Sequence, residues 1–151
     1  MNDVQRLFSA LTLVFTLVLA AACSSGLRPP AGGVGAPAPA AAVERFLQLA
    51  GEDQYLEMGW FFGTAEGPIL ERDPPSEVEK RMYALAMVLR NGGYVVGPGA
   101  TVPGRVGAAQ RFTVRLQKEQ RQVEVPVIVV RGPGERWLVE QIDVQAITGT
   151  R

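Results

Sequence analysis

From residue 41 onward, the spacing of apolar residues has the period of a helix. One helix face is formed by residues at positions i, i+3, i+4 and i+7, namely Val43, Phe46, Leu47 and Ala50. Gly51 follows them, and glycine often ends a helix because it adopts a left-handed conformation without strain. The pattern predicts a first amphipathic helix over residues 41–50.

Two further helices are expected before the pattern changes. Asp53 can cap a second helix over residues 54–62, which is rich in large apolar side chains. After a loop of turn-forming residues, Ser76 and Glu79 have the spacing of a capping box, in which both side chains bond free amides at a helix start. The third helix ends at residues 91–93 and carries one apolar stripe, made of Val78, Met82, Leu85 and Leu89.

After residue 93, apolar and polar residues alternate, as in half-buried strands. The alternation predicts four strands, over residues 94–96, 111–117, 123–131 and 136–145. Residues 132–134 predict the turn between the last two strands. Pro126 cannot donate a ladder hydrogen bond, so it is expected at an edge, a bulge or a bend. Helices followed by an antiparallel meander indicate one α+β domain over residues 41–147, with residues 148–151 as a tail.

Residues 1–22 have the layout of a signal peptide for export. A short polar start precedes an uncharged, mostly apolar run over residues 7–22. This run is shorter than the roughly 20 residues that cross a bilayer as a helix. A permanent transmembrane anchor is therefore the weaker alternative.

The end of this run, Leu19-Ala20-Ala21-Ala22-Cys23, resembles the lipobox of bacterial lipoproteins. The resemblance implies that the thiol of Cys23 receives a diacylglyceryl group, that the chain is cut between Ala22 and Cys23, and that the new amine is acylated. The family favours leucine where this chain has Ala20, and the alternative is an ordinary secretory signal cut after Ala22. Ser24, standing where an aspartate would favour inner-membrane retention, favours the outer membrane, facing the periplasm.

Residues 23–40 are expected to be the lipidated cysteine and a flexible tether. The segment after Cys23 is almost entirely Ser, Gly, Pro and Ala, with Arg28 as its only charge, so it buries too little apolar surface to fold. At roughly 3.1 Å per residue, the polyproline spacing, it holds a domain at most about 50 Å from the membrane. The expected location is the bacterial cell envelope, with the membrane as a partner through Cys23.

Three helices before a bent antiparallel sheet resemble the nuclear transport factor two-like superfamily, a cone-shaped α+β fold, and its bacterial lipoprotein members. Four segments carry the resemblance: Val43-Glu44-Arg45-Phe46-Leu47, Gly51-Glu52-Asp53-Gln54-Tyr55, Trp60-Phe61-Phe62-Gly63 and Arg136-Trp137-Leu138-Val139-Glu140-Gln141-Ile142. The resemblance implies helices packed on a curved sheet of about four strands, and it allows a homodimer through that sheet. A cystatin-like sheet over one helix is the rival fold, but it does not account for three helical segments.

Charge and composition narrow the classes of partner. The 15 basic and 15 acidic residues balance, and no basic run occurs, so nucleic acid is not an expected partner. The chain has no histidine and one cysteine, which removes the commonest metal ligand, an internal disulfide and a cysteine-rich zinc site. We therefore expect no metal and no cofactor.

Enzymes of the resembled superfamily place acids, tyrosines or histidines in an apolar cone. Glu140 and Asp143 lie on opposite faces of the last predicted strand, so the face turned inward brings one acid among apolar neighbours, which raises a carboxyl pKa. The alternative is an acid at a strand end or paired with an arginine. Aromatic residues near it line a pocket or, more commonly, simply fill the core. The candidate pocket consists of Trp60, Phe61, Phe62, Trp137, Glu140 and Asp143.

The sequence assembles neither a nucleophile with a base nor a cluster of metal ligands. We therefore expect a membrane-anchored envelope lipoprotein whose domain is a non-catalytic binding or protein-interaction module. The alternative is a domain that binds a small apolar ligand, or acts as an enzyme, in a cone pocket with a single carboxylate.

The lipobox generates a direct prediction. Mass spectrometry of the mature protein should find Cys23 as the first residue, carrying acyl chains whose buried methylenes each contribute about 0.8 kcal/mol to membrane anchoring. An unmodified Cys23 at the amino terminus, or a retained signal segment, would contradict it.

Overall fold

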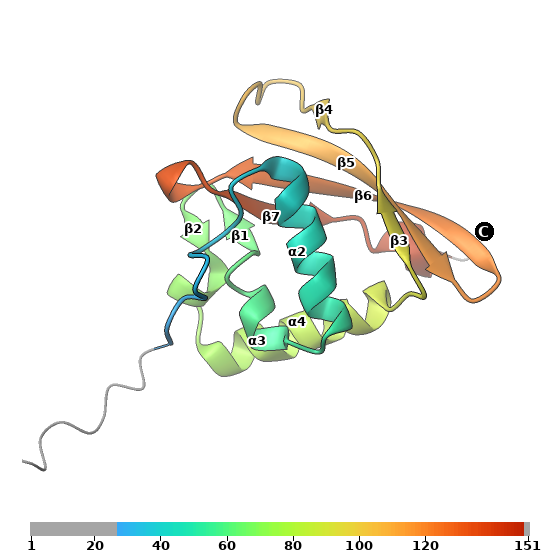
Figure 1. The fold of residues 1–151 in the computed structure, drawn as a ribbon, viewed down its shortest axis with the longest axis horizontal. Coiled ribbons are helices and arrows are strands. Elements are labelled where there is room, and N and C mark those ends of the chain that lie inside the picture. The colour runs from blue at the N-terminus through green and yellow to red at the C-terminus, as the bar shows by residue number, and fades with distance from the viewer. Residues whose placement is uncertain (1–26, 150–151) are drawn as a thin grey trace, which may run out of the picture.

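The computed structural model describes residues 27–149, which form an α+β domain (Figure 1). The signal peptide expected at residues 1–22, with its cleavage after Ala22, and the lipidation expected at Cys23 lie outside the described residues. Within residues 27–149, no helix combines the length and the apolar character needed to cross a membrane.

Two long helices and several short ones make up the helical part of the domain. The long helices, α2 (Pro39–Gly51) and α4 (Pro75–Leu89), each begin with a proline in the first turn. Proline suits this position because its φ is already helical and its missing N–H would have no partner there. The short elements are α3 (Tyr55–Met58), α5 (Gln145–Thr148) and two 3-10 helices, η1 (Ile69–Glu71) and η2 (Pro133–Glu135).

The two apolar stripes predicted for the long helices are largely confirmed. The buried residues of α2 are Ala42, Val43, Phe46, Leu47 and Leu49. The buried residues of α4 are Val78, Met82, Ala86 and Leu89. Ala50 and Leu85, which were expected on these stripes, are half-buried at their margins.

The expected second helix is wrong beyond Met58, where α3 ends. The following residues join the sheet instead: the carbonyl of Phe61 accepts a hydrogen bond from the Val139 amide at 2.8 Å, and Phe62 forms a parallel bridge with Val139. Asp53 is not the N-cap, because Gln54 takes that position and Asp53 has a left-handed φ of 58°.

The capping box expected at Ser76 and Glu79 is not formed either. The N-cap of α4 is Pro74, and no side chain caps the helix. Pro75 has its φ set for a helix, so α4 begins before Ser76 and moves that residue inside the first turn.

The main sheet has five antiparallel strands, one more than expected. They are β3 (Tyr94–Val96), β4 (Ala100–Thr101), β5 (Ala109–Lys118), β6 (Arg121–Arg131) and β7 (Trp137–Ile142). Their order is β3-β5-β6-β7, and β4 also pairs with β5. A separate hairpin joins β1 (Gly63–Thr64) to β2 (Gly67–Pro68). The last predicted strand is too long, since β7 ends at Ile142 and the chain then turns into α5.

Pro126 lies where the sequence predicts it, at a local edge. It pairs with Thr113 of β5, while on its other side its carbonyl accepts the Asp143 amide at 2.9 Å. The amide and carbonyl of one strand residue point to the same side, so the missing N–H of Pro126 faces the place where β7 has just ended. The pair of Pro126 and Asp143 therefore keeps one main-chain hydrogen bond instead of two, and the ladder ends there.

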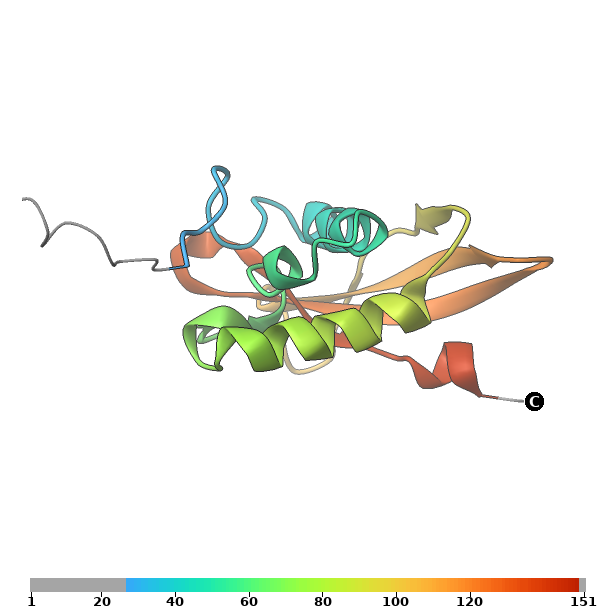
Figure 2. The same cartoon turned by 90° about the horizontal axis from the view of Figure 1, so that it is seen from below.

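The helices cover one face of the sheet. The other face is exposed over part of its area but is buried at Ala109, Val130 and Leu138, which pair side by side across β5, β6 and β7. α2 lies against β6 and β7, and α4 packs against α2 and α3 (Figures 1 and 2). Alternation along β5 separates the two faces: Phe112, Val114 and Leu116 are buried, whereas Arg111, Thr113 and Arg115 are exposed. The core therefore lies between α2, α4 and the inner face of β5, β6 and β7.

Part of the segment expected as a free tether is fixed to the domain. Ala36 exchanges two main-chain hydrogen bonds with Trp137, at 2.9 and 2.8 Å, and the Gly35 amide donates to the Trp60 carbonyl at 3.0 Å. The guanidinium of Arg136 donates to the carbonyls of Gly32, Val34 and Gly35 at 2.8 to 3.0 Å. Gly35 is required here, because its φ is 64° and a Cβ would lie 2.8 Å from the Trp137 carbonyl oxygen. Contacts with the domain thus begin at Gly32, before the boundary predicted at residue 41.

Candidate functional site

The aromatic residues of the predicted pocket belong to the core. Trp60, Phe61 and Trp137 are 4%, 6% and 6% exposed, and all three lie in the main apolar cluster. The half-buried ring of Phe62 packs on Phe46, with ring centroids 5.8 Å apart. Of the two interpretations open for these residues, core filling therefore describes them, because each large ring is already packed against neighbours.

The two carboxylates of the predicted pocket lie apart and have other partners. Glu140 forms a bidentate ion pair with Arg105, in which Nη1 donates to Oε2 at 2.6 Å and Nη2 donates to Oε1 at 3.0 Å. The hydrogen bond to Glu140 raises the pKa of the Arg105 guanidinium, so that cation stays charged. Asp143 follows the end of β7, where its Oδ1 accepts the Gln145 amide at 3.1 Å at the start of α5. Both acids thus match the alternative of a paired or strand-end carboxylate, and the six predicted residues do not surround one cavity.

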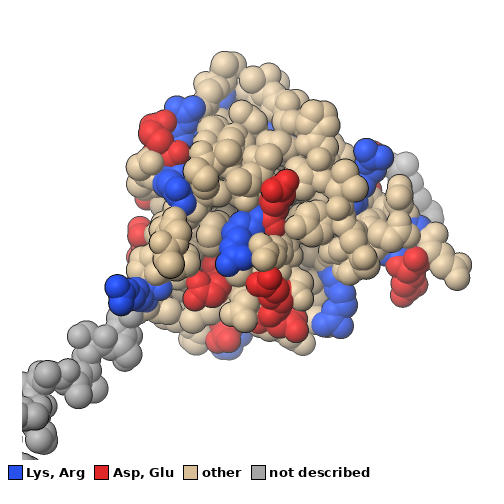
Figure 3. Space-filling model, viewed as in Figure 1, with Lys and Arg blue, Asp and Glu red and all other residues tan. Residues whose placement is uncertain are grey.

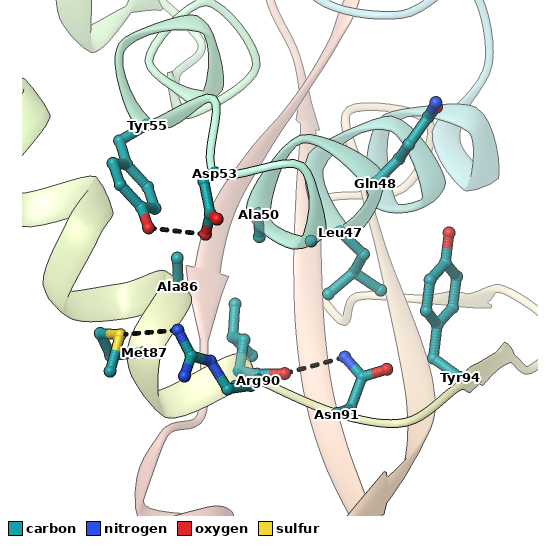
Figure 4. A pocket seen from close by; sticks show the side chains of 12 residues that line it. Leu47, Gln48, Ala50, Asp53, Tyr55, Ala86, Met87, Arg90, Asn91 and Tyr94 are labelled. Atoms are coloured by element: carbon teal, nitrogen blue, oxygen red, sulfur yellow. Dashed lines mark hydrogen bonds between the residues drawn. The ribbon is translucent and has the colours of Figure 1, made fainter.

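A different site is a groove of about 380 Å³ at the end of the domain where α4 meets β3 (Figure 4). Its walls come from the C-terminal half of α2, the turn into α3, the last turn of α4 and the start of β3. The lining residues are Leu47, Gln48, Ala50, Gly51, Asp53, Tyr55, Ala86, Met87, Leu89, Arg90, Asn91 and Tyr94.

The groove combines an apolar floor with polar walls. Leu47 and Leu89 are buried below it, flanked by the small side chains of Ala50 and Ala86. Small residues at these positions keep the two helices from filling the space above the leucines. Polar groups and two aromatic rings surround this floor, an arrangement common to sites for small molecules.

One wall carries an acid joined to a phenol. The Tyr55 hydroxyl donates to Asp53 Oδ1 at 2.7 Å, and its ring meets Tyr83 edge-on with centroids 5.2 Å apart. The hydrogen bond to Asp53, together with the nearby negative charge, raises the pKa of Tyr55 above its ordinary value of 10.0. Tyr55 is therefore a neutral hydrogen-bonding group at physiological pH.

The opposite wall carries a cation. Arg90 follows the last residue of α4, and its Nη2 contacts Met87 Sδ at 3.4 Å. Asn91 donates to the Leu89 carbonyl at 2.9 Å and so satisfies one free carbonyl at the end of the helix. Among the ion pairs of the described residues, none joins Arg90 to Asp53. The groove thus holds two charges of opposite sign that do not neutralise each other by contact.

Tyr94 closes the groove on the side of the sheet. Its hydroxyl donates to the Glu44 carbonyl of α2 at 3.4 Å. Burial, and then the charge of Glu44, raise the pKa of Tyr94 above its ordinary value of 10.0. Like Tyr55, it is a neutral group at physiological pH.

Charge is mixed on the face of the domain that carries α2 and α4. Figure 3 shows lysines and arginines interspersed with acidic residues on this face, without a broad area of one sign. Local pairs such as Arg81 with Asp73, at 2.7 Å, account for part of this pattern. The site on this face is therefore defined by individual side chains rather than by a basic or acidic surface.

Comparison with protein-family models, with curated proteins and with solved structures gives no match for this chain.

The sequence patterns did not single out this groove. The sequence predicts Asp53 as a helix cap and gives no binding role to Arg90 or Tyr94. The sequence signal for the groove is a set of polar and charged residues just beyond the ends of two apolar stripes. These residues are Gly51-Glu52-Asp53 and Arg90-Asn91. That signal is weak, because it does not show that the two helix ends lie side by side.

The Asp53–Tyr55 pair generates a prediction about titration. Because the folded state favours the neutral phenol, its stabilisation is present below pH 10 and is lost as pH rises through the raised pKa. In Asp53→Asn, the pKa of Tyr55 should fall toward 10.0, since the negative charge is gone and the hydrogen bond is weaker. The Cζ shift of ¹³C-labelled tyrosine measures each ring separately.

Glu52→Gln is the matched control, because it removes the same charge one residue away. It should leave the Tyr55 titration near that of the parent protein. Equal titration of Tyr55 in the parent and in Asp53→Asn would show that the carboxylate does not hold the phenol.

Proposed function

We propose that this chain is a lipid-anchored protein of the bacterial cell envelope whose domain binds a ligand or partner without chemical turnover. The groove between α2, α4 and β3 is the proposed binding site. The observation that carries this proposal is the pair of mutually unpaired charges, Asp53 and Arg90, set above an apolar floor. Such groups fix the orientation of a bound molecule while apolar contact supplies affinity.

The ionisable groups of the groove favour recognition over proton transfer. Arg90 contributes a guanidinium, which donates hydrogen bonds and accepts none. Tyr55 and Tyr94 have raised pKa values and stay neutral near pH 7. A general base works best with a pKa near the working pH, a condition that the two phenols do not meet.

The position of the groove suits a tethered domain. The chain reaches the domain at Gly32, beside Arg136 and close to η2, whereas the groove lies at the other end, next to β3 (Figure 1). Gly32 is nine positions after Cys23 in the sequence, and nine steps of roughly 3.1 Å, the polyproline spacing, span about 28 Å. A lipid at Cys23 would hold the domain close to the membrane with its groove directed away from the attachment point.

The nuclear transport factor two-like arrangement remains part of this proposal. Helices that precede an antiparallel meander and pack on one of its faces support it. The second candidate function is docking of an envelope protein or a second copy of the chain on the opposite face, where Arg111, Thr113 and Arg115 are exposed; the resembled superfamily commonly dimerises through its sheet.

Titration of the ¹⁵N-labelled protein with 8-anilinonaphthalene-1-sulfonate, an apolar anion, tests where the domain binds. The amide signals of Asp53, Arg90 and Asn91 should shift, because the dye can lie on the apolar floor with its sulfonate near Arg90. Shifts confined to Arg111 and Arg115 would instead assign binding to the exposed sheet face.

Non-catalytic binding has its own test. Binding in the groove should survive Glu140→Gln and Asp143→Asn, because neither residue lines it. Turnover of any substrate that disappears in either variant would contradict the proposed function.

A further inference from the structure

Asp53 retains hydrogen-bonding capacity directed at the groove. Its Oδ1 accepts the Tyr55 hydroxyl, and no donor among the described residues bonds Oδ2. A carboxylate can accept about four hydrogen bonds. Asp53 is therefore a fixed anion, held in place by Tyr55, with room for one more donor.

Arg90 retains donors on the opposite wall. Its one hydrogen bond among the described residues goes to Met87 Sδ, and a thioether is a weak acceptor. A guanidinium carries five N–H donors in a planar fork that matches a carboxylate. Arg90 therefore offers a cation suited to a carboxylate, with most of its donors unused within the described part of the chain.

The charge balance of the groove restricts its ligand. An anionic apolar molecule would pair with Arg90, but its negative charge would be repelled by Asp53. A cationic molecule would pair with Asp53, but its positive charge would be repelled by Arg90. A molecule with one charge of each sign satisfies both walls. Leu47 and Leu89 form the buried base of the groove, and the exposed Met87 and half-buried Ala50 above them provide the accessible contact for an apolar side chain.

We propose that the groove binds a short peptide-like zwitterion that carries an apolar side chain. Its ammonium group lies against Asp53, its carboxylate against Arg90, and its side chain over Leu47 and Leu89. The volume of about 380 Å³ is in the range of small-molecule sites. This inference names the ligand class of the proposed function and rests on it.

Calorimetric titration of the purified whole protein with L-leucyl-L-leucine tests both contacts. The free dipeptide should bind, and blocking either end, by N-acetylation or by C-amidation, should weaken binding about three- to tenfold because one charge-assisted contact is lost. These changes are made in the ligand, so they leave the fold untouched.

Variants of the protein locate each contact. Asp53→Asn should weaken binding of the free dipeptide about as much as N-acetylation does, and should have no further effect on the N-acetylated peptide. Arg90→Gln should do the same for C-amidation. Asparagine tolerates the left-handed φ of 58° at position 53, which keeps the backbone intact.

Glu52→Gln is the matched control for Asp53→Asn, because it removes a negative charge one residue away. Arg81→Gln is the matched control for Arg90→Gln, because it removes a positive charge from α4. Neither residue lines the groove. Both should bind the dipeptide like the parent protein.

Equal affinity for the free and blocked peptides would overturn the zwitterion inference, as would binding of the apolar anion in the groove without any binding of dipeptide. In both cases the proposed binding function would stand. If neither the anion nor any peptide shifts the groove signals, both proposals fail.

Discussion

The outer edge of β7 is closed by main-chain hydrogen bonds from two segments distant in the sequence. Trp137 exchanges a pair with Ala36, and the Val139 amide donates to the Phe61 carbonyl. Each such bond contributes about 0.5–1.5 kcal/mol, and an open strand edge would otherwise present these groups for pairing with another chain. The closure also fixes Trp60, Phe61 and Trp137 in the core, so the packing of α2 on the sheet depends on it.

This constraint also shapes the groove. Because the chain must reach β7 at Phe61, helical structure stops at Met58, and α3 is a single turn. The short α3 leaves the connection from α2 at the surface, with Asp53 in a left-handed conformation and its carboxylate beside Tyr55. At the far end of α4, Arg90 and Asn91 lead directly into β3. The site thus consists of connections whose positions are set by a rigid layer beneath them, as is common for binding sites.

Periodic patterns predict the helices and strands whose form depends on local residue spacing. They do not predict structure that depends on pairing between residues distant in the sequence. The stripes of α2 and α4, the strand from residue 94 to 96 and the edge position of Pro126 followed from spacing and proline geometry. The second helix was overextended because Trp60, Phe61 and Phe62 are apolar in either structure, and only the partner Val139 decides between them. Likewise, residues 32–36 have a linker composition, yet Arg136, about a hundred residues later, donates hydrogen bonds to the carbonyls of Gly32, Val34 and Gly35. The groove was missed for the same reason, since nothing in the spacing shows that Asp53 and Arg90 share a site.

Amide hydrogen exchange tests the closure of β7 most directly, because the sheet contains its own control. The Trp137 and Val139 amides bond to Ala36 and Phe61, whereas the amides of Tyr94 and Val96, on the other edge strand, point away from β5 by the alternation of the ladder. We expect Trp137 and Val139 to exchange as slowly as the central amides of β6, and Tyr94 and Val96 to exchange much faster. Exchange of Trp137 and Val139 as fast as that of Tyr94 and Val96 would show that β7 is an open edge and that these hydrogen bonds do not close it.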